Sequence, residues 1–409
     1  MPGPPRRAAR PAPDRGRTLL GPALALIHTG QAPTRSALTG ALAVTRATAG
    51  AVAAELAALG LVTVDSRPAG GGRGRPSHRL AVDPAGPVVL AAQIHADGFT
   101  VALAGLGGTV GEPVDLPLPH PGDPGRVLRA VAEAGARLVA ASPRRCLGAG
   151  LAVPTPVTEP DGTAPAAMYL DWPSGAPVAE LFAARLARAA PTPYGPLPAR
   201  VANDANLAAL AEHRHGAGCG ARHLLYVTSG HRGVGGALVV DGRLYTGSAG
   251  LALEVGQLLV APGGRRCPCG RRGCLNVEAD PPALLAAAGL PPDTGEPLLE
   301  RARTVTRAAA HDPAARAAVD LVADRLGIGL AGLVDILNPD RVVLGGLHQD
   351  LLAAAPERLP EALARRSLWG RSGSIPVLAA ALDRPDLTGA AELAWQPYLD
   401  DPLSAAAPG

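Results

Sequence analysis

Three cysteines, Cys267, Cys269 and Cys274, lie within eight positions of one another in the segment LEVGQLLVAPGGRRCPCGRRGCLNVEAD, residues 253–280. Thiolates at such short spacing are typical of a zinc clip, and a structural zinc ion takes four ligands from the protein. Clustered cysteines in a chain that we expect to be cytoplasmic favour metal binding over disulfide bonds. The sequence therefore predicts a metal site with three cysteine ligands and leaves its fourth ligand to be found.

A second polar group stands in VANDAN, residues 201–206, where Asn203 and Asp204 precede a helical pattern. A carboxylate can accept a proton from an alcohol, and an amide can both donate to and accept from a hydroxyl group. The same dipeptide before a helix is also a common capping turn. The residues alone leave a hydroxyl-binding site and a helix cap open as alternatives.

The first part of the chain is strongly basic. Residues 1–80 hold 11 Arg and three acidic residues, a net charge of +8, whereas the remainder holds 27 Arg and 32 acidic residues. A basic segment on a slightly acidic body suggests a polyanionic partner. Residues 1–17, rich in Pro and Arg, predict a disordered tail.

Residues 18–82 predict three helices followed by a hairpin. Helical patterns cover residues 18–30, 34–42 and 45–60, and two strands flank the Gly/Arg segment RPAGGGRGRPSHRL. This is the order of a winged helix-turn-helix domain, which binds double-stranded DNA with its second motif helix in the major groove. A helical hairpin with a basic linker is the alternative. The candidate DNA contacts are Thr45, Arg46 and Thr48 on the helix and Arg73 and Arg75 on the wing.

Residues 88–395 alternate strands and helices, and the same order of hairpin, strands and helices occurs twice. The pattern predicts two similar α/β lobes with a cleft between them, one of about residues 88–200 plus a C-terminal helix and one of about residues 201–385. Residues 396–409 are expected to form a tail. No apolar run approaches the ~20 residues that a membrane span needs. We therefore expect a cytoplasmic protein with no membrane partner.

Several motifs in this order resemble one family. VANDAN, GVGGALVVDGRLYTGSAG, LEVGQ, CPCGRRGC and NPDRVVLGG follow a helical head that ends in GRGRP, and together they resemble the ROK family of sugar kinases and repressors. The resemblance covers about residues 18–395. It implies an α/β fold, an actin-like and hexokinase-like body of two ribonuclease H-like lobes, with a sugar bound in the cleft.

The resemblance assigns roles to the polar residues. Asp204 matches the general base that takes the sugar hydroxyl proton in the family's kinases, Asn203 lies beside it as a hydroxyl ligand, and Glu254 matches a further sugar ligand. Gln257 stands where the family has a histidine that binds zinc and touches the sugar, so the fourth zinc ligand is missing. Zinc held by three thiolates and an outside ligand, and a loop that persists without metal, remain the alternatives. Asn276, in place of a glutamate, is expected to bind a sugar hydroxyl, and Gln257, at the position of the histidine, is expected among the sugar-binding residues as well.

The residues of the expected phosphate-binding loop decide between a kinase and a regulator. Family kinases open the first lobe with Asp-x-Gly-Gly-Thr, but the matching residues here are Gln93, His95 and Ala96. Phosphoryl transfer depends on positioning and on charge stabilisation, so these changes predict a protein that is not an enzyme and needs no ATP. The sequence predicts a transcriptional regulator, a repressor of carbohydrate metabolism, that binds a sugar or sugar-phosphate effector as a homodimer or homotetramer. An ATP-dependent ROK sugar kinase is the alternative.

Overall fold

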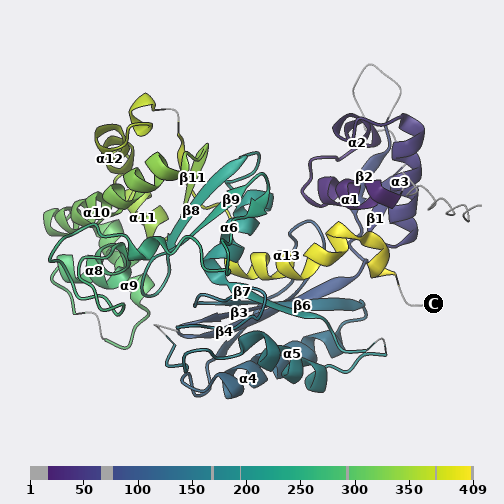
Figure 1. Cartoon of the computed structure of the whole chain (residues 1–409), viewed down its shortest axis with the longest axis horizontal. Helices are drawn as coiled ribbons and strands as arrows, with labels where there is room; N and C mark the ends of the chain where they lie inside the picture. Colours follow the sequence, from purple (N-terminus) through teal and green to yellow (C-terminus); the bar gives the residue numbers. More distant parts are fainter. Residues whose placement is uncertain are drawn as a thin grey trace, which may run out of the picture. The chain divides into compact units, whose positions relative to one another are not determined.

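The computed structural model describes residues 17–65, 77–166, 170–193, 195–291, 294–373 and 375–406. The chain divides into two compact units, one of residues Met1–Pro87 with Trp395–Gly409 and one of residues Val88–Ala394. We call them the head and the body and describe each by itself (Figure 1). Helix α13, Pro385–Asp400, contains residues of both units. The segment 396–409, expected as a tail, includes the end of α13 and the short helix η4, Pro402–Ala405.

The head has the predicted order of elements. It consists of η1 (Arg17–Leu19), α1 (Leu20–His28), α2 (Arg35–Ala41), α3 (Arg46–Ala58), β1 (Val62–Asp65) and β2 (Arg79–Val82), and the two strands pair antiparallel. Thr34 and Thr45 cap α2 and α3, because their side-chain oxygens accept hydrogen bonds of 3.1 Å and 3.2 Å from the backbone N–H groups of Ala37 and Thr48. Leu24, Leu38 and Leu56, one from each helix, are fully buried.

Helices α2 and α3 are joined by four residues, 42–45, and the chain bends by 113° between them. Helix-turn-helix motifs join two helices at about 90–120° through a turn of about three or four residues. The turn length and the bend of this pair fall within these ranges. The segment between β1 and β2, residues 66–76, lies outside the described residues, and so do Arg73 and Arg75.

The first lobe of the body is built on a five-stranded sheet of order β5-β4-β3-β6-β7. β3 pairs antiparallel with β4 and parallel with β6. Helices α4 and α5 pack on one face of the sheet (Figure 1). The elements are β3 (Val88–His95), β4 (Gly98–Ala104), β5 (Val114–Pro117), α4 (Pro124–Ala141), β6 (Cys146–Val153), α5 (Val178–Ala189) and β7 (Ala199–Asn203).

The second lobe repeats this arrangement with the sheet order β10-β9-β8-β11-β12. β8 pairs antiparallel with β9 and parallel with β11, as β3 does with its two neighbours. The prediction of two similar α/β lobes is confirmed. The strands are β8 (His223–Ser229), β9 (Gly235–Val240), β10 (Arg243–Leu244), β11 (Arg341–Gly346) and β12 (Val377–Ala379).

The remaining helices of the second lobe cover its sheet and form its separate helical layer. Long helix α10 packs against α12, α9 and α8, and α11 packs on β11 and β8. The elements are η2 (Val255–Gln257), α7 (Leu275–Glu278), α8 (Pro281–Ala287), α9 (Leu298–Ala308), α10 (Pro313–Leu337), α11 (Leu347–Ala354), α12 (Arg358–Arg366) and η3 (Gly370–Ser372).

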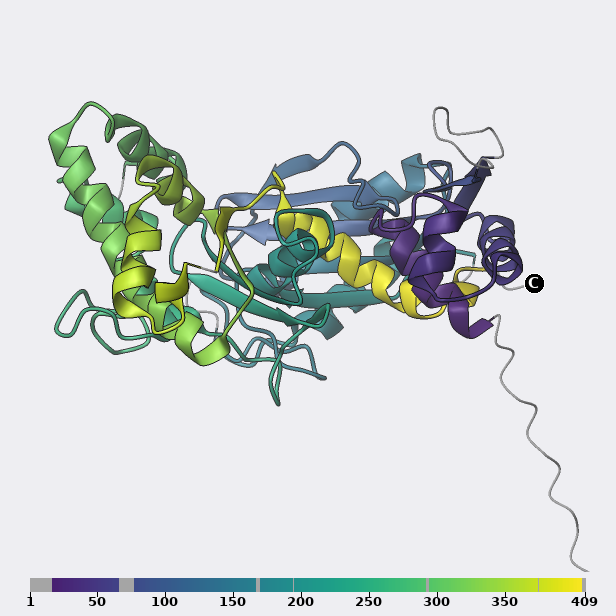
Figure 2. The same ribbon diagram turned by 90° about the horizontal axis from the view of Figure 1, so that it is seen from above.

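Helix α6, Asp204–His215, contacts strands of both sheets, and both views place the start of α13 beside it (Figures 1 and 2). The approach is close, because a Cβ atom on Gly389 of α13 would overlap the backbone carbonyl of Leu207. A Cβ atom on Gly150 of β6 would overlap the carbonyl of Ala390 in the same way. Glycines at these two contacts let α13 lie against both α6 and the first sheet.

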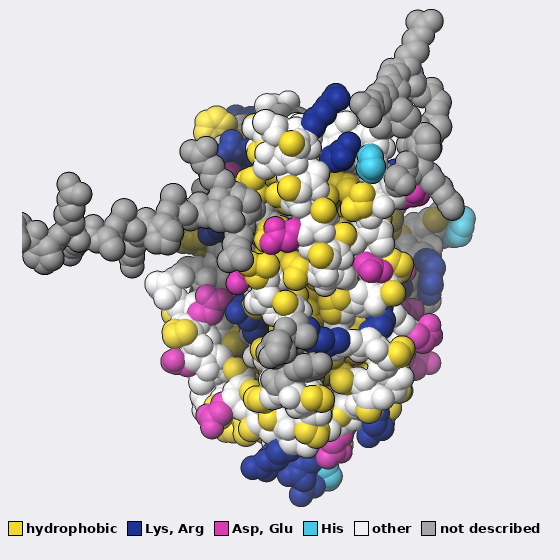
Figure 3. All heavy atoms as spheres, turned by 90° about the vertical axis from the view of Figure 1, so that its right-hand side faces the viewer, with side chains coloured by type: hydrophobic (Ala, Val, Ile, Leu, Met, Phe, Trp, Pro, Cys, Tyr) yellow, Lys and Arg dark blue, Asp and Glu magenta, His cyan; other side chains and the backbone are white. Residues whose placement is uncertain are grey.

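The surface reflects the composition. Figure 3 shows a face on which hydrophobic side chains lie between charged side chains of both signs, which gather mainly toward its edges. The chain as a whole is 47% hydrophobic and 18% charged. In the described part of the chain, no single helix is long and apolar enough to cross a membrane. Helices α2 and α3 reach the length and apolar composition of a membrane span only when they are counted as one segment, and the chain bends by 113° between them.

Candidate functional site

A cavity of about 340 Å³ lies in the body and is lined by residues of both lobes. Its volume is within the range of about 300–1,000 Å³ that is typical of small-molecule sites. Residues from the end of β3, the start of α6, the turn after β8 and the start of α13 contribute to its wall. The polar residues that matter here are Gln93, His95, Asn203, Asp204, Glu254, Asn276 and Asp386.

Asn203 and Asp204 lie where β7 ends and α6 begins. Asn203 is the helix cap: its Oδ1 accepts from the backbone N–H of Asn206 at 3.2 Å, and its Nδ2 donates to Asp204 Oδ1 at 3.1 Å. Asp204 Oδ1 also accepts from the backbone N–H of Ala205 at 2.8 Å. The dipeptide is therefore a helix cap, and the cap fixes the orientation of the carboxylate in the cavity wall, whereas hydroxyl binding stays a prediction.

The pKa of Asp204 is raised, first because the carboxyl is buried and further because Glu254 adds negative charge. Glu254 follows Leu253, whose φ of 64° turns the chain sharply before η2. Burial also raises the pKa of Glu254. Carboxyl groups that are buried together in a cavity wall are typical of ligand sites, where a hydroxyl or cationic group of the ligand restores their lost hydration.

Asn276 lines the cavity, but its amide is already engaged within the protein. Its Oδ1 accepts from the backbone N–H of Val234 at 2.8 Å, and its Nδ2 lies 3.8 Å from Cys267 Sγ. A Cβ atom on Gly256 would lie 2.8 Å from the same Oδ1, so the Glu254 turn packs directly on this amide. Asn276 thus joins the cysteine loop, the glycine-rich turn after β8 and the Glu254 turn.

The three predicted metal ligands come together. The Sγ atoms of Cys267, Cys269 and Cys274 lie within 4.8 Å of one another, and within the described ranges no histidine or carboxylate joins them. Gln257 is not among the residues that line the cavity, and its Oε1 accepts from Arg271 Nη2 at 3.4 Å. These residues fit three of the four positions of a structural zinc site, and the described part of the chain offers no ligand of the usual type for the fourth.

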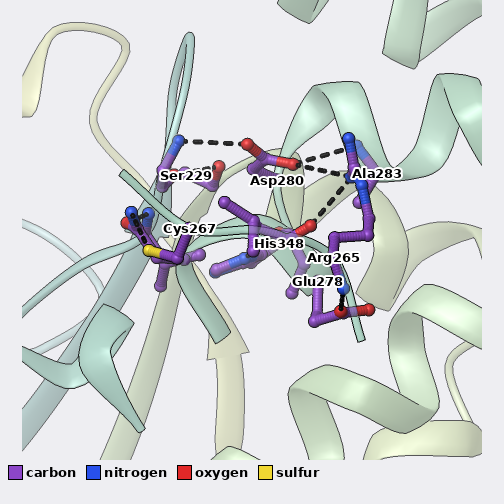
Figure 4. A network of polar contacts seen from close by, with 12 residues as sticks. Ser229, Arg265, Cys267, Glu278, Asp280, Ala283 and His348 are labelled. Atoms are coloured by element: carbon purple, nitrogen blue, oxygen red, sulfur yellow. Dashed lines mark hydrogen bonds and ion pairs between the residues drawn. The ribbon is translucent and has the colours of Figure 1, made fainter. Parts of the chain in front are cut away.

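A network of polar contacts connects the cysteine loop to the cavity (Figure 4). Asp280 accepts from the backbone N–H groups of Gly233 and Ala283 at 3.3 Å and 2.9 Å, and it lies 3.6 Å from Arg265. His348 on α11 is fully buried, and its Nε2 lies 2.9 Å from the carbonyl oxygen of Ala279. These contacts hold the turn after β8 through the backbone of the turn and not through its side chains.

The end of β3 and the turn after it contact a residue that the sequence analysis did not predict. Gln93, His95 and Ala96 all line the cavity, and Gln93 Nε2 donates to Asp386 Oδ2 at 2.6 Å. The pKa of Asp386 is raised by burial and then by the charge of Asp204. We did not predict Asp386. Its position as an acidic residue in the first turn of α13 was the available signal, but acidic residues at helix starts are common.

Three of the five predicted DNA contacts are among the described residues, and they lie at the start of α3. Thr45 and Arg46 are exposed and Thr48 is half-buried, with the two threonine hydroxyl oxygens 2.9 Å apart. Arg35 of α2 was not predicted. Its Nη1 lies 3.5 Å from where a Cβ atom on Gly50 would stand, so its guanidinium group lies over α3 and adds a long basic side chain to a helix that has few.

The comparison with known proteins agrees with the two lobes and their cavity. The model of the ROK family matches residues 92–396, most of the chain, and the protein belongs to the ROK family. The similarity includes both enzymes and regulators. A glucokinase of Halalkalibacterium halodurans is 40% identical over 162 residues, which cover 37% of this chain and 49% of that protein.

A putative xylose repressor of a Caldicellulosiruptor species is 34% identical over 210 residues, 49% of this chain and 50% of that protein. The chain thus matches about half the length of these two relatives. Among solved structures, a ROK family transcriptional regulator that is a homologue of the E. coli MLC protein has a TM-score of 0.75 at 23% identity. The match covers 95% of this chain and 98% of that one and shows a shared fold.

Proposed function

We propose that this protein is a sugar-responsive transcriptional regulator, a repressor of carbohydrate metabolism. Its head binds double-stranded DNA, and its cavity binds a sugar or sugar-phosphate effector without phosphorylating it. The observation that carries the proposal is the geometry of α2 and α3, a capped helix pair with a four-residue turn and a 113° bend, on a segment of net charge +8. Such a pair places the start of its second helix in the major groove.

The DNA contacts follow from this placement. Thr45, Arg46 and Thr48 at the start of α3 are the proposed base and phosphate contacts, and Arg35 adds a phosphate contact beside them. Arg73 and Arg75 are proposed for a wing that reaches phosphates or the minor groove. Because helix-turn-helix proteins commonly read two half-sites, we propose that the protein acts as a homodimer or a homotetramer.

The end of β3 and the turn after it differ from the corresponding residues of the family's kinases. A kinase needs groups that stabilise the negative charge of the transferred phosphate. Here Gln93 stands at the position of the family's acid, and the carboxyl group of Asp386 is hydrogen-bonded to it. Gln93 supplies no acid for a magnesium ion, and His95 and Ala96 take the places of the glycines whose backbone would approach the phosphate.

Sugar kinase activity is the second candidate. It is favoured by Asp204, which stands at the position of the family's general base and lines the cavity, and by the glucokinase relative. Zinc binding is proposed separately for Cys267, Cys269 and Cys274, with an outside molecule as fourth ligand. Its role would be to hold the loop that Asn276 connects to the cavity.

The regulator proposal is tested by fluorescence anisotropy with labelled DNA duplexes over a range of salt concentrations. We expect binding whose affinity falls steeply with salt, because phosphate contacts release counterions. Arg46→Ala should weaken binding and lower the slope of log K against log salt by about one. Arg129→Ala, which removes an exposed arginine from α4 in the body, is the matched control. Failure of the full chain to bind duplexes at low salt would contradict the proposal.

A further inference from the structure

Two thiols of the cysteine loop, residues 265–274, are close enough to react with one another. All five cysteines of the chain are free thiols, and three of them lie in this loop. Cys269 is exposed and Cys274 is buried, and their Sγ atoms lie 3.7 Å apart. An exposed thiol in contact with a second, protected thiol is the arrangement of an attacking and a resolving cysteine.

The backbone of the loop brings Cys269 and Cys274 together. Gly270 and Gly273 lie between them with φ angles of 90° and 75°, which residues with a side chain rarely adopt. The turn is fixed by backbone hydrogen bonds, because the N–H of Gly270 donates to the Cys267 carbonyl at 3.0 Å. A bond between Cys269 and Cys274 therefore closes a turn that is already formed.

Cys267 is a poorer partner for Cys269, although its Sγ atom is also nearby. Only Pro268 separates the two residues, and its ring restricts the backbone of the small ring that their disulfide would close. The Sγ atom of Cys267 is also engaged, because Asn276 Nδ2 donates to it at 3.8 Å. We therefore expect Cys267 to keep its thiol when the other two cysteines are joined.

The exposed thiol lies in a strongly basic loop. All four arginines of the loop are exposed: Arg265, Arg266, Arg271 and Arg272. Arg265 lies 3.6 Å from the buried carboxylate of Asp280. Among the described residues, the side chain of Arg266 has neither a hydrogen-bond nor an ion-pair partner. A cluster of positive charge raises the local concentration of anions, so the loop favours an anionic reagent over a neutral one.

We propose that Cys269 and Cys274 form a reversible disulfide by exchange with an anionic low-molecular-weight disulfide, RSSR. Cys269 Sγ attacks one sulfur atom of RSSR, whose S–S bond breaks, so that one RS⁻ leaves and Cys269 carries a mixed disulfide. Cys274 Sγ then attacks Cys269 Sγ and releases the second RS⁻. The two cysteines give two electrons to the reagent, and their two protons pass through solvent to form two RSH.

This disulfide and a zinc ion at the loop exclude each other, because both use the sulfur atoms of Cys269 and Cys274. Gln257 adds no ligand of the usual type, so a zinc ion here has three protein ligands instead of four. Oxidation leaves Cys267 as the single thiol of the loop. Metal and oxidant therefore compete for the same two residues.

The test uses the full chain with Cys146 and Cys219, the two cysteines outside the loop, replaced by serine. Metal is removed with a chelator, glutathione disulfide is added, and the products are identified by peptide mass spectrometry. We expect a disulfide between Cys269 and Cys274, with the loss of two hydrogen atoms and no lasting glutathione adduct. A lasting adduct, a disulfide that includes Cys267, or no reaction would overturn the proposal. The wild type, mapped in the same way, serves if the serine replacements prevent folding.

Three variants assign the steps. Cys274→Ser lacks the resolving thiol and should accumulate a mixed disulfide at Cys269. Cys269→Ser should lower the rate at which loop thiols are lost by about ten-fold or more, because the remaining two are buried. Cys267→Ser is the matched control and should still form the disulfide. An unchanged rate in Cys269→Ser, or no adduct in Cys274→Ser, contradicts these assignments.

The charge of the reagent is tested with hydroxyethyl disulfide, which is neutral. Each rate is divided by the rate of the same reagent with mercaptoethanol, so that intrinsic reactivity cancels. We expect the anionic reagent to be favoured about ten-fold at low salt, and less so at high salt or in Arg266→Ala. Arg129→Ala, on α4, is the control and should preserve the preference. Equal normalised rates for the two reagents would overturn the choice of an anionic disulfide.

The competition with metal is measured by adding zinc chloride before glutathione disulfide. Zinc in excess over the protein should slow formation of the disulfide by about ten-fold or more, because it occupies both sulfur atoms. Reduction with dithiothreitol should restore all three thiols and the zinc content measured by metal analysis. Oxidation at the same rate with and without zinc would show that metal and disulfide do not share these residues.

Discussion

Two turns of the body occupy equivalent places but have different constructions. The turn between β3 and β4 in the first lobe has two residues, with the ladder continuing to the pair His95 and Gly98. The equivalent turn between β8 and β9 in the second lobe spans residues 230–234 and is followed by Gly235 and Gly236. Both line the same cavity.

The difference lies in what holds each turn. The second turn keeps its glycines and is fixed through its backbone, because Gly233 N–H donates to Asp280 and Ser229 Oγ donates to the Gly233 carbonyl at 2.6 Å. At the first turn the end of β3 lines the cavity with side chains, and one of them, Gln93, is hydrogen-bonded to Asp386. The comparison teaches that a duplicated topology preserves the path of the chain but not the chemistry at its turns.

The largest expected effect concerns phosphoryl transfer, which depends on the first turn. We expect no ATP-dependent phosphorylation of sugars by the wild type, because Gln93, His95 and Ala96 offer neither an acid for magnesium nor open backbone for phosphate. A coupled assay of ADP release with a panel of sugars measures this. Turnover on the order of 1 s⁻¹ or more would remove the distinction between the two turns and favour the kinase.

The second prediction concerns the network behind the turn of the second lobe. Burial lowers the pKa of His348 from 6.5 to about 4. The folded protein therefore binds fewer protons at this ring than the unfolded chain, and its contribution to the free energy of unfolding is lost as the pH falls from 6.5 towards 4. The buried carboxyl of Asp386 has the opposite sign, because its raised pKa means that folding favours its protonated form at low pH.

Urea unfolding of the wild type and of His348→Gln at pH 7 and pH 4 separates these contributions. The wild type should lose about 3 kcal/mol more than the variant on acidification, from a difference of 2.5 pKa units at this group. Equal losses in the two proteins would show that His348 does not remain neutral in the folded network.

The third prediction compares Asp204, a carboxyl group in the cavity wall, with Glu133, a carboxyl group outside the cavity. Asp204→Asn should raise the Kd of the sugar that gives the largest thermal shift by about ten- to a hundred-fold, because a hydrogen bond to a charged group contributes about 1.5–3 kcal/mol. DNA affinity in the absence of ligand should not change. Glu133→Gln, an exposed carboxyl on α4, should leave both unaltered. Unchanged sugar affinity in Asp204→Asn would remove this residue from the site.

The smallest expected effect is a change in metal content at the cysteine loop. Gln257→His should raise the zinc measured by metal analysis towards one ion per chain, because it supplies a fourth ligand of the usual type. Gln257→Ala is the control, since it removes the amide without adding a ligand. If the wild type already retains one zinc ion per chain through dialysis against a chelator, Gln257 does not mark a lost ligand.

The sequence by itself determined the elements and most of the candidate site. Helix caps at Thr34 and Thr45, the repeated order of strands and the spacing of the cysteines are local signals, because propensity, capping and periodicity act over a few residues. Five residues were predicted for the cavity from a resemblance that includes their order along the chain, and four of them, Asn203, Asp204, Glu254 and Asn276, line it, whereas Gln257 does not. Their contact with a ligand remains a prediction.

The tertiary structure decided what these residues do together. Gln93 and Asp386 are 293 positions apart, and only the packing of α13 on α6 and β6 makes them partners. Gln257, one turn from Glu254 in the sequence, faces Arg271 instead of the cavity, whereas Asn276 uses its amide to hold the backbone of Val234. Local sequence patterns do not predict such partners, because the distance at which two backbones pack depends on the sizes of side chains in segments far apart in the sequence. Here the missing side chain of Gly389 allows α13 to approach the backbone of Leu207.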